Sequence, residues 1–288
     1  WVKDESQNPT GSFKARGMAV AIARNVELGA EMFTLPSNGN AGGAAAAYAA
    51  LHGVSVEVYV PANTPQPLVD EIEAYGGEAI RVEGTIADAG RVSKERASQP
   101  GWFSVATLAE PYRVEGKKMM GYELFWDLGR LPDVVLYPTG GGTGLVGMVK
   151  AFDEMEQLGW VGSERPRMVA VQVSGCAPIV RAFHTGADRA EPWASPEETA
   201  AFGLRVPSAL GDRLMLAGLR ATSGTAVAVD EDEMLHATSR LATKTGVWGS
   251  PEGGACLAAY ERLRADGWLD GHEVSVIFNT GAASKYAS

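Results

Sequence analysis

The chain of 288 residues has few cysteines, few histidines and a deficit of positive charge. Its two cysteines, Cys176 and Cys256, cannot build a disulfide framework, and neither belongs to a C-x-x-C pair. The four histidines stand far apart without metal-ligand spacing, so we expect no metal site. Acidic residues outnumber basic ones by 35 to 25, and this net charge of −10 argues against nucleic acid or a membrane as a partner.

Long apolar runs are missing as well. No uninterrupted run reaches about 18 residues, so we expect no transmembrane helix and a cytoplasmic protein. The chain opens at Trp1 inside a predicted strand, without an initiator methionine or a signal peptide, so we expect that an upstream segment is absent from this sequence. Glycine, by contrast, is abundant: the 35 glycines cluster in two places, which indicates sites where backbone approaches a ligand closely.

Short apolar runs alternate with longer helical patterns along the chain. Val-, Ile-, Tyr- and Phe-rich runs bounded by turn residues predict strands at 32–35, 55–60, 79–82, 133–137, 168–173 and 274–278. Helical periodicity is clearest at 15–28, 42–51, 67–75, 113–128, 145–158, 231–245 and 252–266. This alternation predicts an α/β fold with parallel sheets covered on both faces. The stretch 187–210 is rich in proline and acid and predicts a surface excursion.

The first cluster that could carry chemistry is N-P-T-G-S-F-K-A-R-G at 8–17. Asn-Pro and Thr-Gly are turn signals and Ser12 is a good helix cap, which places Lys14 in the first turn of a helix. The positive end of the helix dipole disfavours a protonated amine there, and this favours a nucleophilic lysine. For a lone lysine the ordinary interpretation is a solvated surface residue; the surrounding string favours chemistry.

Two loops that each join a strand to a helix form the other clusters. The loop P-S-N-G-N-A-G-G at 36–43 offers hydroxyl, amide and N–H groups suited to a carboxylate, with a simple capped turn as the alternative. The loop P-T-G-G-G-T-G at 138–144 offers converging N–H groups suited to a phosphate. Gly142-x-Gly144-x-x-Gly147 also matches the dinucleotide fingerprint, although the next strand ends without the carboxylate that the ribose requires. A NAD-binding oxidoreductase is therefore the weaker interpretation of this loop.

Taken together with Asn279-Thr280-Gly281, these three motifs resemble the fold-type II pyridoxal-phosphate enzymes, and most of all their threonine synthase branch. The resemblance runs in order from about residue 2 to 286. It implies two parallel-sheet, three-layer domains of the tryptophan synthase beta-like type, with pyridoxal 5′-phosphate in the cleft between them. The small domain would span 8–131, and the large domain would combine 1–7 with 132–288.

The resemblance also assigns roles to particular positions. Lys14 would hold the cofactor covalently and move protons at the substrate's α and β carbons, while Asn40 would contact the cofactor's phenolic oxygen. Thr280 would face the pyridine nitrogen as a neutral hydroxyl, which makes a weaker electron sink suited to elimination and replacement. The remaining contacts implied are Phe13 packing the pocket, Ser37, Asn38 and Ala41 at the substrate carboxylate, and Gly140, Gly141, Gly142, Thr143 and Gly144 around the cofactor phosphate.

The stretch E-P-Y-R-V-E-G-K-K at 110–118 resembles the P-x-R-x-E-G-x-K of threonine synthases. The match makes Arg113 the clamp for a substrate phosphate, with Lys118 nearby; an ordinary surface arginine is the alternative. Glu110 stands where these enzymes often have Asn, and its charge would repel a phosphate unless it points away. Ala15, Met119 and the run at 282–284 also depart from the branch. These departures bear on the substrate and not on the cofactor.

The favoured function is conversion of O-phosphohomoserine and water into threonine and phosphate. The nearest competitor is a threonine or serine dehydratase that releases a 2-oxo acid and ammonia, and Arg113 favours the first. A non-catalytic amino-acid-binding relative is disfavoured by the presence of Lys14. The expected partner is a small amino-acid substrate, with a homodimer left open. Glu252, in S-P-E-G-G-A, either faces the cofactor ring or simply offsets a helix dipole.

Overall fold

The structure is a computed structural model that describes residues 1–286. It contains two compact units, one formed by 8–116 and the other by 1–7 together with 117–286. The division lies inside α5 (Tyr112–Leu128), one helix before the boundary that the sequence suggests at 131. Each unit carries its own parallel sheet with helices on both faces, which confirms the predicted fold class.

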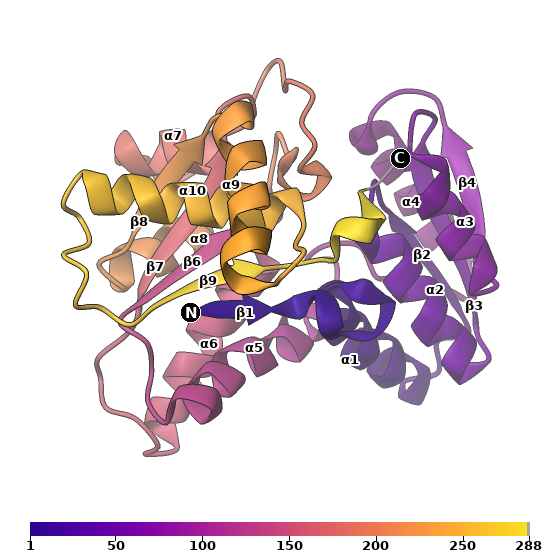
Figure 1. Ribbon diagram of the computed structural model, residues 1–288. Helices are drawn as coiled ribbons and strands as arrows, with labels where there is room; N and C mark the ends of the chain where they lie inside the picture. Colours follow the sequence, from indigo (N-terminus) through magenta and orange to yellow (C-terminus); the bar gives the residue numbers. More distant parts are fainter. Residues whose placement is uncertain (287–288) are drawn as a thin grey trace. The chain divides into compact units, whose positions relative to one another are not determined.

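The smaller unit is built on a four-stranded parallel sheet in the order β4-β3-β2-β5 (Figure 1). Its strands are β2 (Met32–Pro36), β3 (Ser55–Pro61), β4 (Glu78–Val82) and β5 (Trp102–Ser104). Its helices are α1 (Lys14–Glu27), α2 (Asn40–His52), α3 (Gln66–Ala74) and α4 (Ile86–Ala97).

Successive side chains of strand β2 point alternately to the two faces of this sheet, one covered by α2 and the other by α4. Phe33 and Leu35 of β2 pack with the alanines of α2 in one apolar core. Thr34 points to the other face, where its hydroxyl lies 3.0 Å from that of Ser93 on α4. Alanine and glycine let α2 lie close to its neighbours, because a Cβ on Gly42 would approach Ile72 Cδ1 to 2.8 Å.

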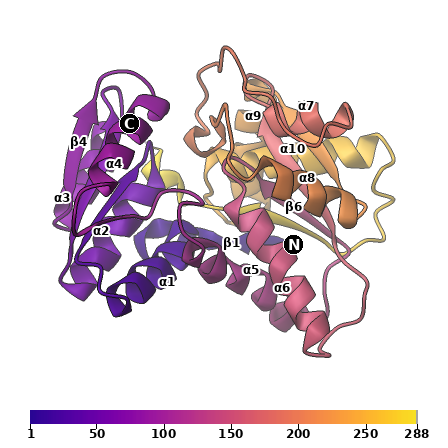
Figure 2. The same ribbon diagram turned by 180° about the vertical axis from the view of Figure 1, so that it is seen from behind.

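The larger unit is built on a five-stranded parallel sheet in the order β1-β9-β6-β7-β8. Its strands are β1 (Val2–Asp4), β6 (Val134–Pro138), β7 (Arg167–Val173), β8 (Thr225–Val229) and β9 (Ser275–Asn279). Helices α9 (Glu231–Thr245) and α10 (Pro251–Ala265) cover one face in Figure 1, and α6 (Thr143–Gln157) and α8 (Asp212–Ala221) cover the other in Figure 2. The short α7 (Pro178–His184) packs beside α8. All residues of β6 and β9 are buried, as expected of central strands in a doubly covered sheet.

The predicted opening strand, the six further predicted strands and the seven predicted helices are all present, with ends shifted by a few residues at most. The sequence prediction missed β5, β8, α4, α7 and α8, of which β5 and α7 are short. Helix α4 carried a readable signal, since Thr85 and Asp88 form a capping box at its start. The stretch 187–210 forms a short 3-10 turn, Phe202–Leu204, but is not wholly a surface excursion: Ala201 and Leu204 are buried in the core of the larger unit.

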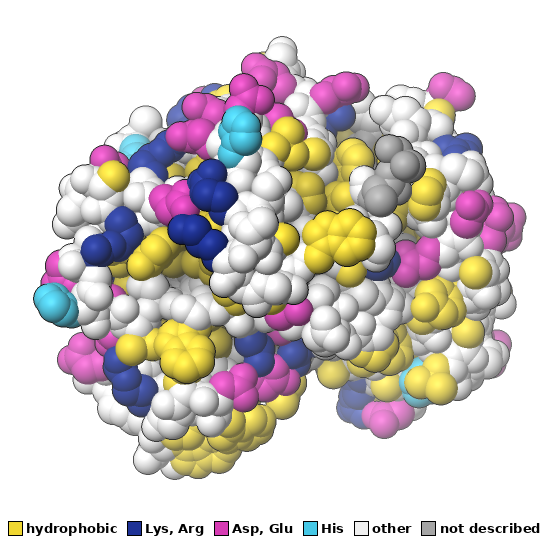
Figure 3. Space-filling view, viewed as in Figure 1, with side chains coloured by type: hydrophobic (Ala, Val, Ile, Leu, Met, Phe, Trp, Pro, Cys, Tyr) yellow, Lys and Arg dark blue, Asp and Glu magenta, His cyan; other side chains and the backbone are white. Residues whose placement is uncertain are grey.

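The surface of the larger unit carries an aromatic cluster near the ends of α5 and α6, where apolar side chains gather in Figure 3. Tyr122 packs against Trp126 and Trp160, and Phe125 stacks on Trp160. The two tryptophans are about half exposed. No helix within residues 1–286 is long and apolar enough to span a bilayer.

Candidate cofactor and substrate site

In the smaller unit, Lys14 is the first residue of α1. A turn with left-handed backbone at Thr10 and Gly11 precedes it, closed by a 2.9 Å hydrogen bond from Gly11 N to Asn8 O. The buried Ser12 hydroxyl accepts from Lys14 N at 3.4 Å, but the residue at the cap position of α1 is Phe13, which makes no side-chain capping hydrogen bond, so the prediction that Ser12 caps the helix is wrong. Lys14 Nζ lies 3.9 Å from the centroid of the Phe13 ring. The turn therefore holds the amine at a helix start against an aromatic face.

The loop after β2 is organised by Ser37. Its hydroxyl accepts from the N–H groups of Gly42 (3.0 Å) and Gly39 (3.3 Å) and donates to Gly39 O at 2.8 Å. Its own N–H donates to Tyr59 O at 2.9 Å. Both hydrogens of Ser37 are thus used inside the unit, so this residue shapes the loop. The predicted carboxylate contacts then depend on the N–H groups of Asn38 and Ala41, while Asn40 opens α2 and is half-buried.

Arg113 is buried, with 3% of its surface exposed. Its Nη1 donates to Val105 O at 2.9 Å and to Thr107 Oγ1 at 3.4 Å. Val105 follows β5, the neighbour of β2, so the guanidinium is anchored near the strand edge from which the 37–41 loop departs. Burial lowers the pKa of Arg113 to about 10, partly offset by the charge of Glu110, so the group stays charged at neutral pH.

The Nε–Nη2 edge of Arg113 is the part of the side chain without a hydrogen-bond acceptor in residues 1–286. Nε is fully buried, and among residues 1–286 no atom accepts a hydrogen bond from either nitrogen of that edge. A buried charged donor without an acceptor is costly, and a ligand with paired oxygens would remove that cost. The geometry therefore fits an oxyanion such as a phosphate.

The Glu110 carboxylate is held by hydrogen bonds to the start of α5. Its carboxylate accepts from the N–H groups of Tyr112 at 2.5 Å and Arg113 at 3.1 Å, which caps the start of α5. An acidic residue at this end also offsets the helix dipole. Glu110, which stands where threonine synthases often have Asn, thus serves as a cap of helix α5.

In the larger unit, the 139–144 loop joins β6 to α6. Gly142 has φ 79°, a left-handed backbone that favours glycine. A Cβ at Gly140 would overlap Gly203 O, one at Gly142 would overlap Met215 Sδ, and one at Gly144 would overlap the Tyr137 hydroxyl. The loop is therefore a cradle of bare backbone that packs tightly against Gly203, Met215 and Tyr137.

The cradle presents donors that the protein itself does not use. Within the described part of the chain, the N–H groups of Gly140, Gly141 and Gly142 donate to no acceptor. The Thr143 hydroxyl is nearly buried, and the positive end of α6 points the same way. Converging N–H groups at a helix start fit a phosphate group.

We expect Gly144→Ala to destabilise the larger unit, because the Tyr137 ring is buried and packed edge-on to Phe278 at 5.2 Å. The free energy of unfolding should fall by about 1–3 kcal/mol, as for other overpacked cores. Denaturant unfolding would measure this change. Gly162→Ala is the matched control, since a Cβ there meets nothing within 4 Å. Equal stabilities of the two variants would contradict the cradle geometry.

Thr280 follows β9, the strand that pairs with β6 in parallel, so it leaves the same sheet edge as the 139–144 loop. It is nearly buried. The preceding Asn279 is locked in place: Oδ1 accepts from Ser250 N at 2.9 Å and Nδ2 donates to Asp4 Oδ1 at 2.7 Å. The predicted pyridine partner is thus held on a rigid strand end.

Glu252 is buried at the start of α10. Oε1 accepts from Gly203 N at 3.0 Å and from the Tyr286 hydroxyl at 3.0 Å, so the carboxylate ties the 3-10 turn to the end of the described chain. Oε2 is buried, and within residues 1–286 no donor reaches it. Glu252 therefore does more than offset the dipole of α10, because it also links Gly203 and Tyr286. Its role toward the cofactor ring stays a prediction.

Two neighbouring lysines on α5 have different surroundings. Lys118, the predicted substrate contact, pairs with Glu154 of α6 at 2.8 Å. Lys117, which the sequence analysis did not single out, is 1% exposed and donates to Thr143 Oγ1 of the cradle at 2.6 Å. Helical spacing places the two lysines on different faces, because Lys117 lies four positions after Arg113 and shares its face, whereas Lys118 does not. Which face meets the loop is set by packing.

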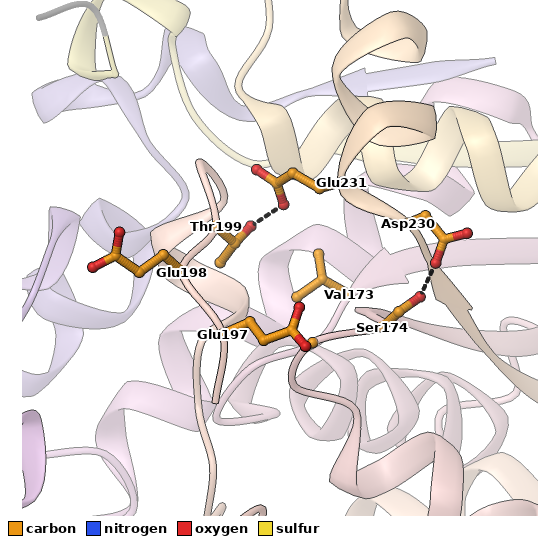
Figure 4. Close-up of a pocket in the computed structure, with 8 residues that line it drawn as sticks. Val173, Ser174, Glu197, Glu198, Thr199, Asp230 and Glu231 are labelled. Atoms are coloured by element: carbon orange, nitrogen blue, oxygen red, sulfur yellow. Dashed lines mark hydrogen bonds between the residues drawn. The ribbon is translucent and has the colours of Figure 1, made fainter. Parts of the chain in front are cut away.

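A pocket in the larger unit is lined by none of the predicted site residues. Figure 4 shows around it Glu197 and Glu198 from the 187–210 stretch, and Asp230 and Glu231 from the end of β8 and the start of α9. Thr199 Oγ1 donates to Glu231 at 2.7 Å. Four carboxylates repel a phosphate, so this pocket does not suit a phosphorylated ligand. Across residues 1–286 no three His, Cys, Asp or Glu side chains are placed to share a metal ion.

The two cysteines are buried in the larger unit. Cys176 and Cys256 are both free and fully buried, and burial raises the pKa of each thiol. A buried thiol that keeps its proton behaves as a small hydrophobic side chain. Cys176 and Cys256 both lie in the apolar core of the larger unit.

The cradle, the helix-start lysine and the strand-end threonine are the features of an enzyme that binds a phosphorylated cofactor. Residues 1–281 match the family described as pyridoxal-phosphate dependent enzymes, and the chain belongs to this family. Its cofactor is pyridoxal 5′-phosphate, which the bare-backbone cradle fits. The resemblance stated from sequence is therefore confirmed at the level of the family.

Individual relatives narrow the comparison. Threonine synthase from Methanosarcina acetivorans is 32% identical over 287 residues, which cover 99% of this chain and 70% of that protein. Among solved structures, a threonine deaminase from T.th. superposes with a TM-score of 0.81 at 25% identity, covering 98% of this chain and 86% of that one. Maize serine racemase gives a TM-score of 0.84 at 23% identity, covering 100% of this chain and 83% of that one, and shows the shared fold.

Proposed function

We propose that the protein is a pyridoxal-phosphate-dependent lyase that acts as a threonine synthase. O-phosphohomoserine loses phosphate from its γ carbon, and water adds at the β carbon to give threonine. When bound, pyridoxal phosphate supplies an electron sink for the substrate's α carbon. The observation that carries the choice of substrate is Arg113, which is buried and charged and whose Nε–Nη2 edge has no acceptor within residues 1–286. The planar fork of that edge matches two phosphate oxygens.

The other residues have roles that follow from their chemistry. The Lys14 amine holds the cofactor and carries protons to and from the α and β carbons. The 37–41 loop orients the substrate carboxylate through N–H groups at the start of α2. We propose these further cofactor contacts: Phe13, Asn40, Gly140, Gly141, Gly142, Thr143, Gly144 and Thr280. The 8–116 unit would be the small domain of the enzyme, and the other unit the large domain.

The test is to identify products with O-phosphohomoserine, threonine and serine offered side by side to the purified holoenzyme. We expect threonine and inorganic phosphate from O-phosphohomoserine, and little 2-oxobutyrate from threonine. A threonine or serine dehydratase would give the reverse pattern. This alternative has support from the structural likeness to a threonine deaminase. Formation of 2-oxobutyrate without turnover of O-phosphohomoserine would overturn the proposal.

We expect Thr280→Asp to change the ratio of products. A carboxylate at the pyridine nitrogen would hold it protonated and strengthen the electron sink, so elimination should slow and transamination should increase. Product ratios and the visible spectrum of the bound cofactor measure this. Thr280→Ser keeps the hydroxyl and is the matched control. An Asp variant that behaves like the parent would show that Thr280 is not the pyridine partner.

A further inference from the structure

The placement of Lys117 is unusual for a lysine. It is 1% exposed, although lysine is almost never fully buried. Removing an ammonium from water is costly, and the positive end of α6 adds a repulsion, because Thr143 is the first residue of that helix. An anion held in the 139–144 loop would attract both the ammonium and the positive end of the helix.

We propose that Lys117 is the positive charge that balances the phosphate of the cofactor, acting through Thr143. This inference rests on the proposed role of the 139–144 loop as the phosphate site. Lys117 Nζ donates to Thr143 Oγ1 at 2.6 Å, so the oxygen accepts from the ammonium and the hydroxyl hydrogen can be donated onward. A hydroxyl that accepts from a cation is a stronger donor, because hydrogen bonds in series polarise one another.

The two kinds of contact in the cradle then have different functions. The N–H groups of Gly140, Gly141 and Gly142 set the position of the phosphate, and they carry no net charge. Lys117 supplies a full charge from behind the loop, where Figure 2 shows α5 running beside α6. Lys118, the next residue, is paired with Glu154 and cannot substitute for it without leaving that ion pair. Lys117 is therefore a positioning residue for the cofactor and not a catalytic one.

The experiment compares two forms of the cofactor that differ only in the phosphate. Apo-protein would be titrated with pyridoxal phosphate and with pyridoxal. The ratio of the two dissociation constants measures how much the phosphate group contributes to the affinity. In Lys117→Gln, which keeps a donor for Thr143 and loses the charge, affinity for pyridoxal phosphate should fall roughly 10- to 100-fold. Affinity for pyridoxal should stay unchanged, and Lys117→Arg should restore part of the loss.

Lys150→Gln is the matched control, because it removes one positive charge from α6, the helix that carries Thr143, at a half-exposed position. It should leave the ratio unchanged. An unchanged ratio in Lys117→Gln, or equal losses for both cofactor forms, would overturn the inference. A parent protein that does not prefer pyridoxal phosphate over pyridoxal would instead overturn the assignment of the loop, and this outcome is recognisable before any variant is made.

A second measurement uses the unmodified holoenzyme, so it does not depend on the folding of a variant. The ³¹P chemical shift of the bound cofactor follows the ionisation of its phosphate. The dianion of a phosphate monoester in water takes up a proton at about pH 6 and becomes a monoanion. Beside Lys117 the bound phosphate should stay a dianion well below that pH. A bound phosphate that titrates like the free cofactor would contradict the proposed charge pairing.

Discussion

Lys14→Ala is expected to abolish the covalent attachment of the cofactor and to reduce turnover by at least about 10³–10⁴-fold, since nucleophile and proton carrier are lost together. The fold should survive, because Lys14 is a half-buried residue at a helix start and alanine is a good helix former. Borohydride reduction of the holoenzyme followed by mass spectrometry should find the cofactor on the peptide that contains residue 14.

Lys94→Ala is the control for unspecific labelling, because Lys94 is an exposed lysine on α4 of the same unit. It should retain both the labelled peptide and full activity. If reducible, covalently bound cofactor persists in Lys14→Ala, the amine that holds the cofactor must be sought elsewhere. The remaining cradle assignments would be unaffected by that result.

Arg113→Ala is expected to lower kcat/KM for O-phosphohomoserine by roughly 10²–10⁴-fold. The estimate takes each charge-assisted hydrogen bond as worth about 1.5–3 kcal/mol, with about 1.4 kcal/mol per factor of ten. Arg113→Lys should recover only part of the loss, because an ammonium cannot reproduce the two-pronged edge. Inorganic phosphate should inhibit the parent competitively and the alanine variant hardly at all.

Because Arg113 is buried, its variants need a control for folding. Thermal unfolding and cofactor content should be compared with Arg91→Ala, which removes an exposed arginine from α4 of the same unit. Any activity toward serine or threonine should change far less than activity toward O-phosphohomoserine. A parent enzyme indifferent to both inorganic phosphate and O-phosphohomoserine would exclude the threonine synthase assignment and leave the family and the fold standing.

The features that the sequence predicts correctly are local ones. The turn before Lys14 depends on Gly11, and the 139–144 cradle on glycines without side chains, and such backbone requirements are visible in the residue types themselves. Strands such as β6 and helices such as α9 follow from continuous apolar runs and from helical periodicity. Short elements such as β5 carry too few residues for either pattern to stand out.

The use of each side chain is decided by contacts between residues far apart in the chain. Ser37 donates its hydroxyl hydrogen to Gly39 and its N–H to the distant Tyr59, and Arg113 is anchored by Val105. The spacing of motifs predicts none of these hydrogen bonds. The sequence by itself determined the α/β class, the lysine at the helix start and the bare-backbone loop. Only the tertiary structure decided that Lys117 and not Lys118 meets that loop, because helix packing selects which of two adjacent side chains faces inward.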